Sequence, residues 1–325
     1  MCLDTRGAAA QIALGDFAYP EHLREIASPP SRLYVRGTLA PSDALAVAIV
    51  GSRVATSYGL AMAERLAADL AARGVTIVSG LARGIDSAAH RGALRMGGRT
   101  IAVLGSGVDV IYPPENRRLA REIEAHGAVI SQFEPGTRPL PGYFPARNRV
   151  IAGLSLAVVV VEAAEKSGSL ITAGFAGEMG REVMAVPGPV TSALSIGAHR
   201  LIQDGAALVQ DWEDVAGMLP LRWRDHIKDR PTPAPPTAPL AAAKTDGANH
   251  LAHGQHAEGH VEVKREVEAE SQILALLTEE PTDIDGIIER SGMSPGRASA
   301  LLVTLELEGR IRQLEGKRFV QVRLG

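Results

Sequence analysis

The fold is decided by the stretch VAIVGSR, residues 47–53, in which four apolar residues lead directly into a glycine, a serine and an arginine. A short apolar run that ends in a glycine-containing turn is typical of a buried strand followed by a loop. Residues 58–72 then show helical spacing of apolar side chains and end at Arg73-Gly74, a helix stop signal. These residues therefore predict the first strand–loop–helix unit of an α/β domain.

The same alternation of strands and helices continues to about residue 210. Further strands are predicted at 75–78, 100–104, 128–131, 156–161 and 182–186, and helices at 85–96, 115–126 and 170–180. Repeated units with short connections favour an extended Rossmann-like fold with a doubly wound parallel sheet. Upstream, Leu33-Tyr34-Val35 has the pattern of a short edge strand before Gly37. We therefore expect a short lead-in over 1–43 and a Rossmann-like domain over 44–222.

Two further regions follow this domain. Five prolines between positions 231 and 239, then alanines, histidines and charged residues, predict a flexible linker over 223–270. His250, His253, His256 and His260 have no cysteine beside them, which favours a solvated linker over a metal site. Residues 271–325 carry helical patterns around 273–277, 283–289 and 294–307, then a hairpin signal at 315–317. That order is typical of a small winged-helix domain.

Composition and charge narrow the class of protein. The only cysteine of the chain is Cys2, no apolar stretch reaches the ~18 residues that a membrane span needs, and residues 1–16 do not resemble a signal peptide. A reducing cytoplasm is the simple expectation. The chain has a net charge of −3, but residues 47–210 carry 16 Lys and Arg against 13 Asp and Glu, and 15 of these cations are arginines. Arginine suits phosphate binding, although a coding bias toward arginine explains the same excess.

Several loops are expected at one rim of the sheet, because the carboxyl ends of parallel strands open on the same side. The loops at 51–59 and 166–170 place glycines and hydroxyls at helix starts, where backbone N–H groups bind anions, and the small residues of 79–86 allow close approach. Residues 186–189 form a rigid turn. The candidate phosphate-binding residues of these loops are Gly51, Ser52, Arg53, Ser79, Gly80, Ala82, Lys166, Ser167 and Ser169. Capping alone also explains serines and glycines at helix starts, and Asp86 is expected to cap a helix.

The segment around residues 144–149 adds an aromatic ring beside cations. Phe144 can stack on a base, while Arg147, Asn148 and Arg149 can pair with phosphate or bases. The alternative is that Phe144 fills the core and one arginine caps the sheet. His90 follows Asp86 at helical spacing, as an acid/base pair would, but a packing histidine is favoured. Without a Cys–His pair, metal-ligand spacing or a Gly-x-Ser-x-Gly turn, we predict no catalytic residue, metal or cofactor.

The loop sequences at 51–59, 79–86, 144–149, 166–170 and 186–189, taken in this order, resemble those of the DNA-processing protein A family, also called Smf. The resemblance extends over roughly residues 19–210. The resemblance implies a homodimer that binds and protects single-stranded DNA without sequence preference or catalysis. It also implies that the protein loads RecA recombinase onto incoming strands during natural transformation. Two departures stand out: the helical domain that precedes the Rossmann part in many members is expected to be absent or cut short, and His199 replaces the usual asparagine.

Carried over motif by motif, the resemblance implies a role for each of these loops. Phosphate is held at Ser52, Arg53, Ser167 and Ser169, and the DNA backbone approaches closely at Gly80 and Ala82. Bases and phosphates are contacted by Phe144, Arg147 and Asn148, and Lys166 adds a cationic wall. One alternative is an enzyme like the nucleotide phosphoribohydrolases, with Glu162 and Glu134 as its carboxylates, although residues 166–169 do not match that family's loop. Another is a winged-helix regulator, which needs a more basic recognition helix than Arg297 provides. Residues 271–325 carry 7 Lys and Arg against 8 Asp and Glu, so they predict a helper or partner-binding module.

Overall fold

The computed structural model forms two units, Met1–Leu240 and Ala241–Gly325. It describes residues 3–4 and 9–227 and, in the second unit, 276–277, 282–291, 293, 298, 301–302, 305–306, 311–314 and 318–321. Most of the predicted linker and its four histidines lie outside the described residues.

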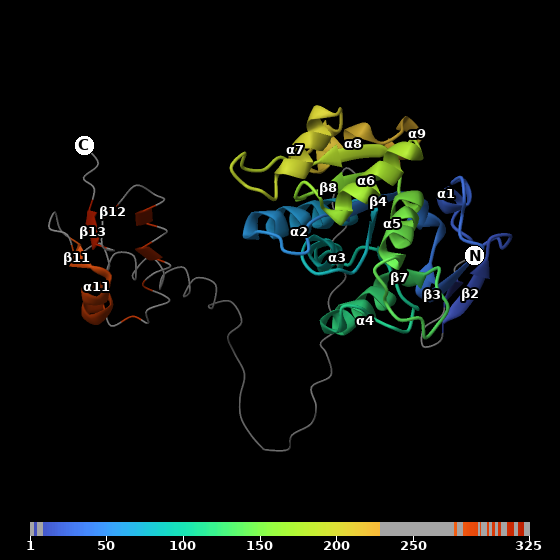
Figure 1. Ribbon diagram of the computed structural model, residues 1–325, viewed down its shortest axis with the longest axis horizontal. Coiled ribbons are helices and arrows are strands. Elements are labelled where there is room, and N and C mark those ends of the chain that lie inside the picture. Colours follow the sequence, from blue (N-terminus) through green and yellow to red (C-terminus); the bar gives the residue numbers. More distant parts are fainter. Residues whose placement is uncertain are drawn as a thin grey trace, which may run out of the picture. The chain divides into compact units, whose positions relative to one another are not determined.

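The first unit is built on a ten-stranded sheet (Figure 1). Its parallel strands are β4 (Ala46–Val50), β5 (Thr76–Ser79), β6 (Thr100–Val103), β7 (Ala128–Ser131), β8 (Ala157–Val160), β9 (Glu182–Ala185) and β10 (Ala207–Leu208). The strand order is β7-β6-β5-β4-β8-β9-β10. The chain therefore moves outward from β4 to β7 and then crosses back to β8, on the other side of β4. This reversal makes the gap between β4 and β8 a switch point, where ligands bind in folds of this kind.

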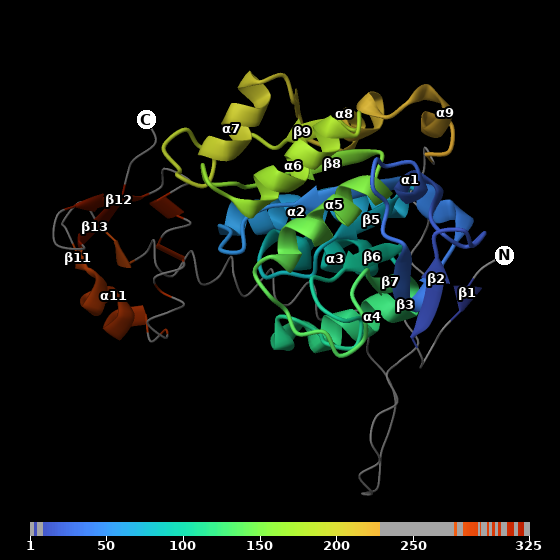
Figure 2. The same cartoon turned by 45° about the vertical axis from the view of Figure 1, so that its right-hand side comes forward.

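Helices cover both faces of the sheet (Figures 1 and 2). They are α2 (Ser57–Ala72), α3 (Ile85–Arg95), α4 (Arg117–His126), α5 (Tyr143–Leu154) and α6 (Gly168–Glu178). Alternate residues of β4 divide between two cores: Val47 and Ile49 pack with α2 and α3, while Ala48 and Val50 pack with α5. Because both faces are covered, the strands are mainly apolar, as predicted for a parallel sheet.

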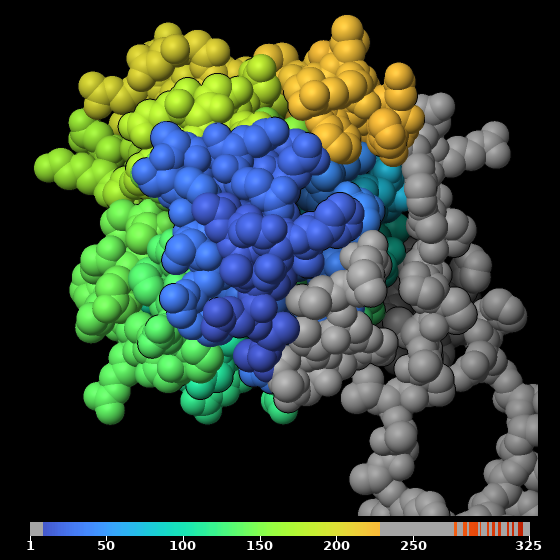
Figure 3. Space-filling model, turned by 90° about the vertical axis from the view of Figure 1, so that its right-hand side faces the viewer, coloured from blue at the N-terminus to red at the C-terminus, as the bar shows by residue number. Residues whose placement is uncertain are grey.

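The N-terminal residues join this sheet, which corrects the prediction of a short edge strand at Leu33-Tyr34-Val35. β3 (Arg32–Leu39) has eight residues and lies inside the sheet, antiparallel to β7 on one side and to β2 (Ala10–Ala13) and β1 (Leu3–Asp4) on the other. Gly37 does not end the strand; its φ of +95° and missing side chain let the strand pass the Gly127 carbonyl. Figure 3 looks onto this end, where the blue N-terminal segment packs against the rest of the unit.

Helix α5 was not predicted, because Pro145 resembles a helix breaker. Pro145 is the third residue of the helix, where a backbone N–H has no intrahelical partner, so the ring is tolerated. Other short elements also lacked a sequence signal: α1 (Glu21–Arg24), η1 (Pro41–Ala44), η2 (Pro114–Asn116), α7 (Ile196–Gln203), α8 (Trp212–Met218) and α9 (Leu221–Arg224). No helix in the described part of the chain is long and apolar enough to cross a membrane.

The second unit contains α11 (Ile284–Ser291) and a three-stranded sheet of β11 (Thr282–Asp283), β12 (Ile311–Leu314) and β13 (Arg318–Gln321). The predicted hairpin is confirmed, because β12 and β13 pair antiparallel. Its small core includes Ile287, Leu302 and Phe319. The helices predicted around 273–277 and 294–307 lie largely outside the described residues.

The contact between α2 and α3 yields a stability prediction. A Cβ added to Gly92 of α3 would lie 2.1 Å from the backbone carbonyl oxygen of Glu64 in α2. Gly92→Ala should therefore lower the free energy of unfolding by about 1–3 kcal/mol, although alanine is the better helix former. The matched control is Gly174→Ala in α6, where no atom beyond its own helix backbone and chain neighbours lies within 4 Å of the added Cβ. That change should stabilise by up to ~1 kcal/mol in urea unfolding. Equal effects of the two changes would contradict the close packing of α2 and α3.

Candidate nucleic-acid interface

A cleft of about 490 Å³ opens at the switch point between β4 and β8; we call it the strand cleft. It collects most of the predicted site residues from four separate segments of the chain: Gly51, Ser52, Arg53, Ala82, Phe144, Arg147, Asn148, Lys166, Ser167 and Ser169. These residues come from the loops after β4, β5 and β8 and from the first turns of α5 and α6. The reversal of strand order therefore brings together loops that are more than 100 residues apart in the sequence.

Three predicted site residues do not line the strand cleft. Ser79 is fully buried, and its hydroxyl donates to the Ile49 carbonyl at 2.7 Å, so its side chain cannot face a ligand. Gly80 lines the neighbouring pocket instead. Arg149 is half-buried and lies outside both pockets.

The start of α6 forms one wall of the strand cleft. Ser167 caps the helix, because its hydroxyl accepts from the Ser169 N–H at 3.3 Å. The Asn148 side-chain amide donates to the Gly168 carbonyl at 3.1 Å, which joins α5 to this helix start. A helix N-terminus carries partial positive charge, and the exposed Lys166 beside it adds a full charge. This wall is therefore suited to an anion.

The loop after β4 is held by a buried carboxylate. Glu162, 3% exposed, accepts from the Thr56 N–H at 2.9 Å and from the Thr56 hydroxyl at 2.5 Å. Its backbone carbonyl also accepts from the Ser52 N–H at 2.7 Å. The Ser52 hydroxyl bonds within the loop, to the backbone of Val54. Glu162 thus has a structural role, and the loop it fixes presents the exposed Arg53 to the cleft.

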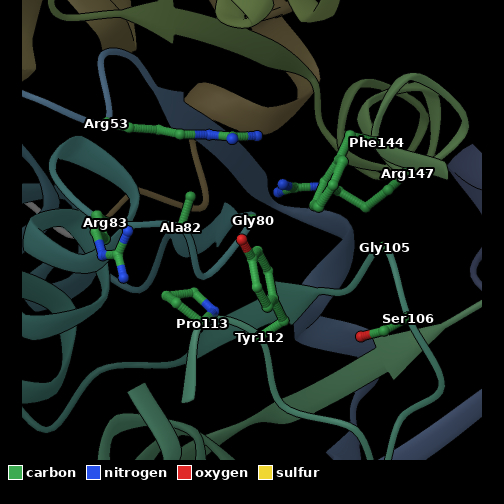
Figure 4. Close-up of a pocket in the computed structure, with 10 residues that line it drawn as sticks. All are labelled: Arg53, Gly80, Ala82, Arg83, Gly105, Ser106, Tyr112, Pro113, Phe144 and Arg147. Carbon is green, nitrogen blue, oxygen red and sulfur yellow. The ribbon is translucent and has the colours of Figure 1, made fainter. Parts of the chain in front are cut away.

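The ring of Phe144 lies close to two guanidinium groups, those of Arg53 and Arg147 (Figure 4). The Cζ atom of Arg53 is 5.1 Å from the ring centroid, and that of Arg147 is 5.7 Å away. Both distances fall within the range of cation–π attraction. Phe144 is half-buried and belongs to none of the hydrophobic cores, so its ring is a wall of the cleft.

A buried ion pair lies behind this ring. Arg147 is 4% exposed and Asp86 is 6% exposed, and Arg147 Nη1 is 3.6 Å from Asp86 Oδ2. Burial raises the pKa of the Asp86 carboxyl, and the Arg147 guanidinium opposes that rise. Gly80 makes room for the pair, since a Cβ there would fall 1.1 Å from Arg147 Nη1. The cap of α3 is Gly84, which corrects the expectation for Asp86: its carboxylate accepts from the Ala82 N–H at 3.3 Å and faces Arg147.

The loop between β5 and α3 is strained at Leu81. Its φ of +60° is the only positive φ of a non-glycine residue among the described residues. Such a conformation costs on the order of 1 kcal/mol and persists only where the surroundings enforce it. Here the Leu81 side chain is fully buried, and its carbonyl accepts from the Asn116 amide at 2.8 Å. The loop is therefore rigid, and it holds Ala82 at the floor of the cleft.

Two histidines singled out in the sequence have packing roles. His90 is fully buried, and its Nδ1 lies 2.7 Å from the Thr100 hydroxyl. Burial lowers the pKa of His90 to about 3, so the ring is neutral at pH 7. His199 reaches from α7 to the turn after β9, with Nε2 2.9 Å from the Gly188 carbonyl oxygen. The residue that departs from the family pattern therefore anchors this turn.

Both units of the chain match known protein families. Residues 10–220 match the family described as DNA recombination-mediator protein A, and residues 264–317 match the DprA winged helix domain. Protein Smf of Synechocystis is 39% identical over 310 residues, which cover 93% of this chain and 77% of that protein. DNA processing protein DprA of Streptococcus pneumoniae is 48% identical over 200 residues, 62% of this chain and 71% of that protein.

Solved structures agree with this placement. The structure of DNA processing protein A from Streptococcus pneumoniae matches with a TM-score of 0.62 and 45% identity, covering 66% of this chain and 76% of that one. DNA processing protein A from Helicobacter pylori, solved to show its single-stranded DNA binding mode, matches with a TM-score of 0.58 and 29% identity, covering 66% and 96%. The chain therefore belongs to the DprA/Smf family of DNA-processing proteins, with a Rossmann-like domain followed by a winged helix.

Proposed function

We propose that the protein binds single-stranded DNA, without regard to sequence, in the strand cleft. The observation that carries the proposal is the convergence of Arg53, Lys166 and the N-terminus of α6 on one cleft, beside the Phe144 ring. Cations together with an aromatic face are what proteins use to hold the backbone and the bases of a single strand. The Helicobacter pylori relative, solved for its single-stranded DNA binding mode, supports the same ligand.

The hydrogen-bonding state of the cleft supports binding without sequence preference. The Asn148 amide donates to the protein backbone, and the hydroxyls of Ser52 and Ser167 bond within their own loops. Few side-chain groups are therefore left to recognise a base edge, whereas the cations and the ring act on any nucleotide.

We also propose that the protein acts by binding rather than by catalysis. Glu162 is one of the two carboxylates considered for a hydrolase, but it is buried and both of its oxygens accept hydrogen bonds from Thr56. Glu134 is largely exposed and lies 3.9 Å from Arg32, where it offers no enclosed site for a base. The neutral His90 is fully buried, and its Nδ1 pairs with the Thr100 hydroxyl. These contacts support a binding role, because neither glutamate nor the buried His90 is placed to transfer a proton to a ligand.

The proposal extends to partners. We propose a homodimer that works in the cytoplasm, protects incoming DNA and loads RecA recombinase onto it during natural transformation. The matching family is described as a recombination mediator, which supports delivery of the strand to a recombinase. Within the described residues, β10 pairs only with β9, and Leu208 on this edge is 42% exposed. An uncovered strand edge with an apolar side chain supports pairing with a second copy.

The role of Arg53 is tested by Arg53→Ala. Losing a charged contact to phosphate should weaken binding of a single-stranded oligonucleotide by roughly ten- to a hundredfold. The slope of log affinity against log salt should become shallower by about 0.7, the value for one phosphate contact on a single strand. Fluorescence anisotropy over a range of salt concentrations measures both quantities.

The control is Arg65→Ala, which removes an equally charged side chain on α2 that pairs with Asp69 on the surface. It changes the net charge by the same amount but lies outside the strand cleft. The affinity of Arg65→Ala for the oligonucleotide should stay close to that of the wild type. If the two variants bind alike, the cleft is not the binding site.

The buried pair is tested by Asp86→Asn. The change removes a negative charge from the cleft, which by itself favours DNA, but it leaves Arg147 buried without its partner. We expect the unfolding free energy to fall by about 3–5 kcal/mol. We also expect weaker DNA binding by the protein that remains folded, because Arg147 and the Phe144 ring lose their support. Tighter binding than that of Asp69→Asn, the surface control, would contradict a supporting role for Asp86.

A further inference from the structure

A second pocket adjoins the strand cleft; we call it the ring pocket (Figure 4). The two share Arg53, Ala82, Phe144 and Arg147, so the Phe144 ring and its two guanidiniums form the wall between them. Its volume is about 40 Å³, enough for a few water molecules but too little for a base. A larger ligand therefore has to lie across its mouth.

Tyr112 is the feature of the ring pocket that lacks a structural explanation. Its side chain is 43% exposed in a chain with only 4% aromatic residues. The hydroxyl groups of Tyr19 and Tyr58 donate to backbone carbonyls, but the described residues include no hydrogen-bond partner for the Tyr112 hydroxyl. The ring centroid lies 6.1 Å from that of Phe144, with the ring planes at 49°. One face of an aromatic ring is thus left open beside the strand cleft.

Cations surround this open ring. Arg53 projects over the mouth from one side, and Arg83, held by an ion pair with Glu115, lies on another. The buried Arg147 lines the pocket, and its Nε atom has no hydrogen-bond partner among the described residues. A guanidinium beside an exposed ring attracts a flat ligand that carries hydrogen-bond acceptors.

We propose that Tyr112 and Phe144 form a nucleobase subsite for the same strand. The phosphate of a nucleotide lies in the strand cleft, and its unpaired base extends over Phe144 and stacks on Tyr112 across the mouth of the ring pocket. This inference rests on the proposed function. A base fits because it offers both a π face to the ring and acceptors to the arginines, whereas a free phosphate needs no ring and an apolar side chain needs no cations.

The rigidity of the walls determines where the base lies. A Cβ at Gly105 would lie 3.0 Å from the Phe144 ring, so the backbone after β6 abuts that ring directly. Phe144 therefore separates the two pockets as a fixed wall. Tyr112 is exposed, whereas Phe144 is half-buried, so the Tyr112 ring is the wall that a base can reach from solvent.

The test uses the full chain, an oligothymidylate, and the variants Tyr112→Ala and Tyr112→Phe. Tyr112→Ala should weaken binding about tenfold, the size of one base–aromatic stack, whereas Tyr112→Phe should bind as the wild type does. The salt slope should stay that of the wild type in both variants, because no phosphate contact is lost. On a strand of the same length in which every nucleotide is abasic, no base can stack, so wild type and Tyr112→Ala should bind alike.

Two results would overturn the subsite. One is equal affinity of wild type and Tyr112→Ala. The other is a loss of affinity in Tyr112→Ala that is equally large on the fully abasic strand, which indicates a purely structural effect. If affinity falls in Arg53→Ala but not in Tyr112→Ala, only this subsite is rejected. Wild-type protein that binds no oligonucleotide, or whose binding is indifferent to Arg53→Ala, rejects the proposed function itself.

Discussion

The arrangement of the site depends on one topological constraint, the reversal of strand order at β4. Because β5 lies on one side of β4 and β8 on the other, the loops after these three strands open on a common rim. The crossover from β7 to β8 then brings α5 over the gap with Arg147 on its first turns. No single loop forms the strand cleft, and each contributes a different chemistry: a free cation, a backbone floor, an aromatic wall and a helix N-terminus.

The charges of the cleft are arranged in two layers. Arg53 and Lys166 are exposed and free to meet a ligand, whereas Arg147 is buried and balanced by Asp86. A buried, paired arginine contributes shape and a local positive field without the full cost of an isolated buried charge. The exposed cations supply the attraction for phosphate. This division explains how a chain with a net charge of −3 presents a cationic cleft.

The sequence predicted the parallel sheet well, since strands covered on both faces are mainly apolar, as in Val47 to Val50. Most of the residues that line the strand cleft were also predicted as site residues, because they lie in loops directly after strands. Helix α5 was missed because Pro145 masked a helix start, and the length of β3 was missed because Gly37 looked like an end. The Asp86–Arg147 pair had no sequence signal, because it joins residues 61 positions apart through tertiary packing. The role of Tyr112 likewise depends on neighbours that only the fold supplies.

A crystal structure of the full chain with a short oligothymidylate would show directly whether the strand cleft binds single-stranded DNA. We predict a phosphodiester group in the strand cleft, at the N-terminus of α6 and within hydrogen-bonding distance of Arg53. A strand bound elsewhere on the protein, with the strand cleft empty, would contradict it.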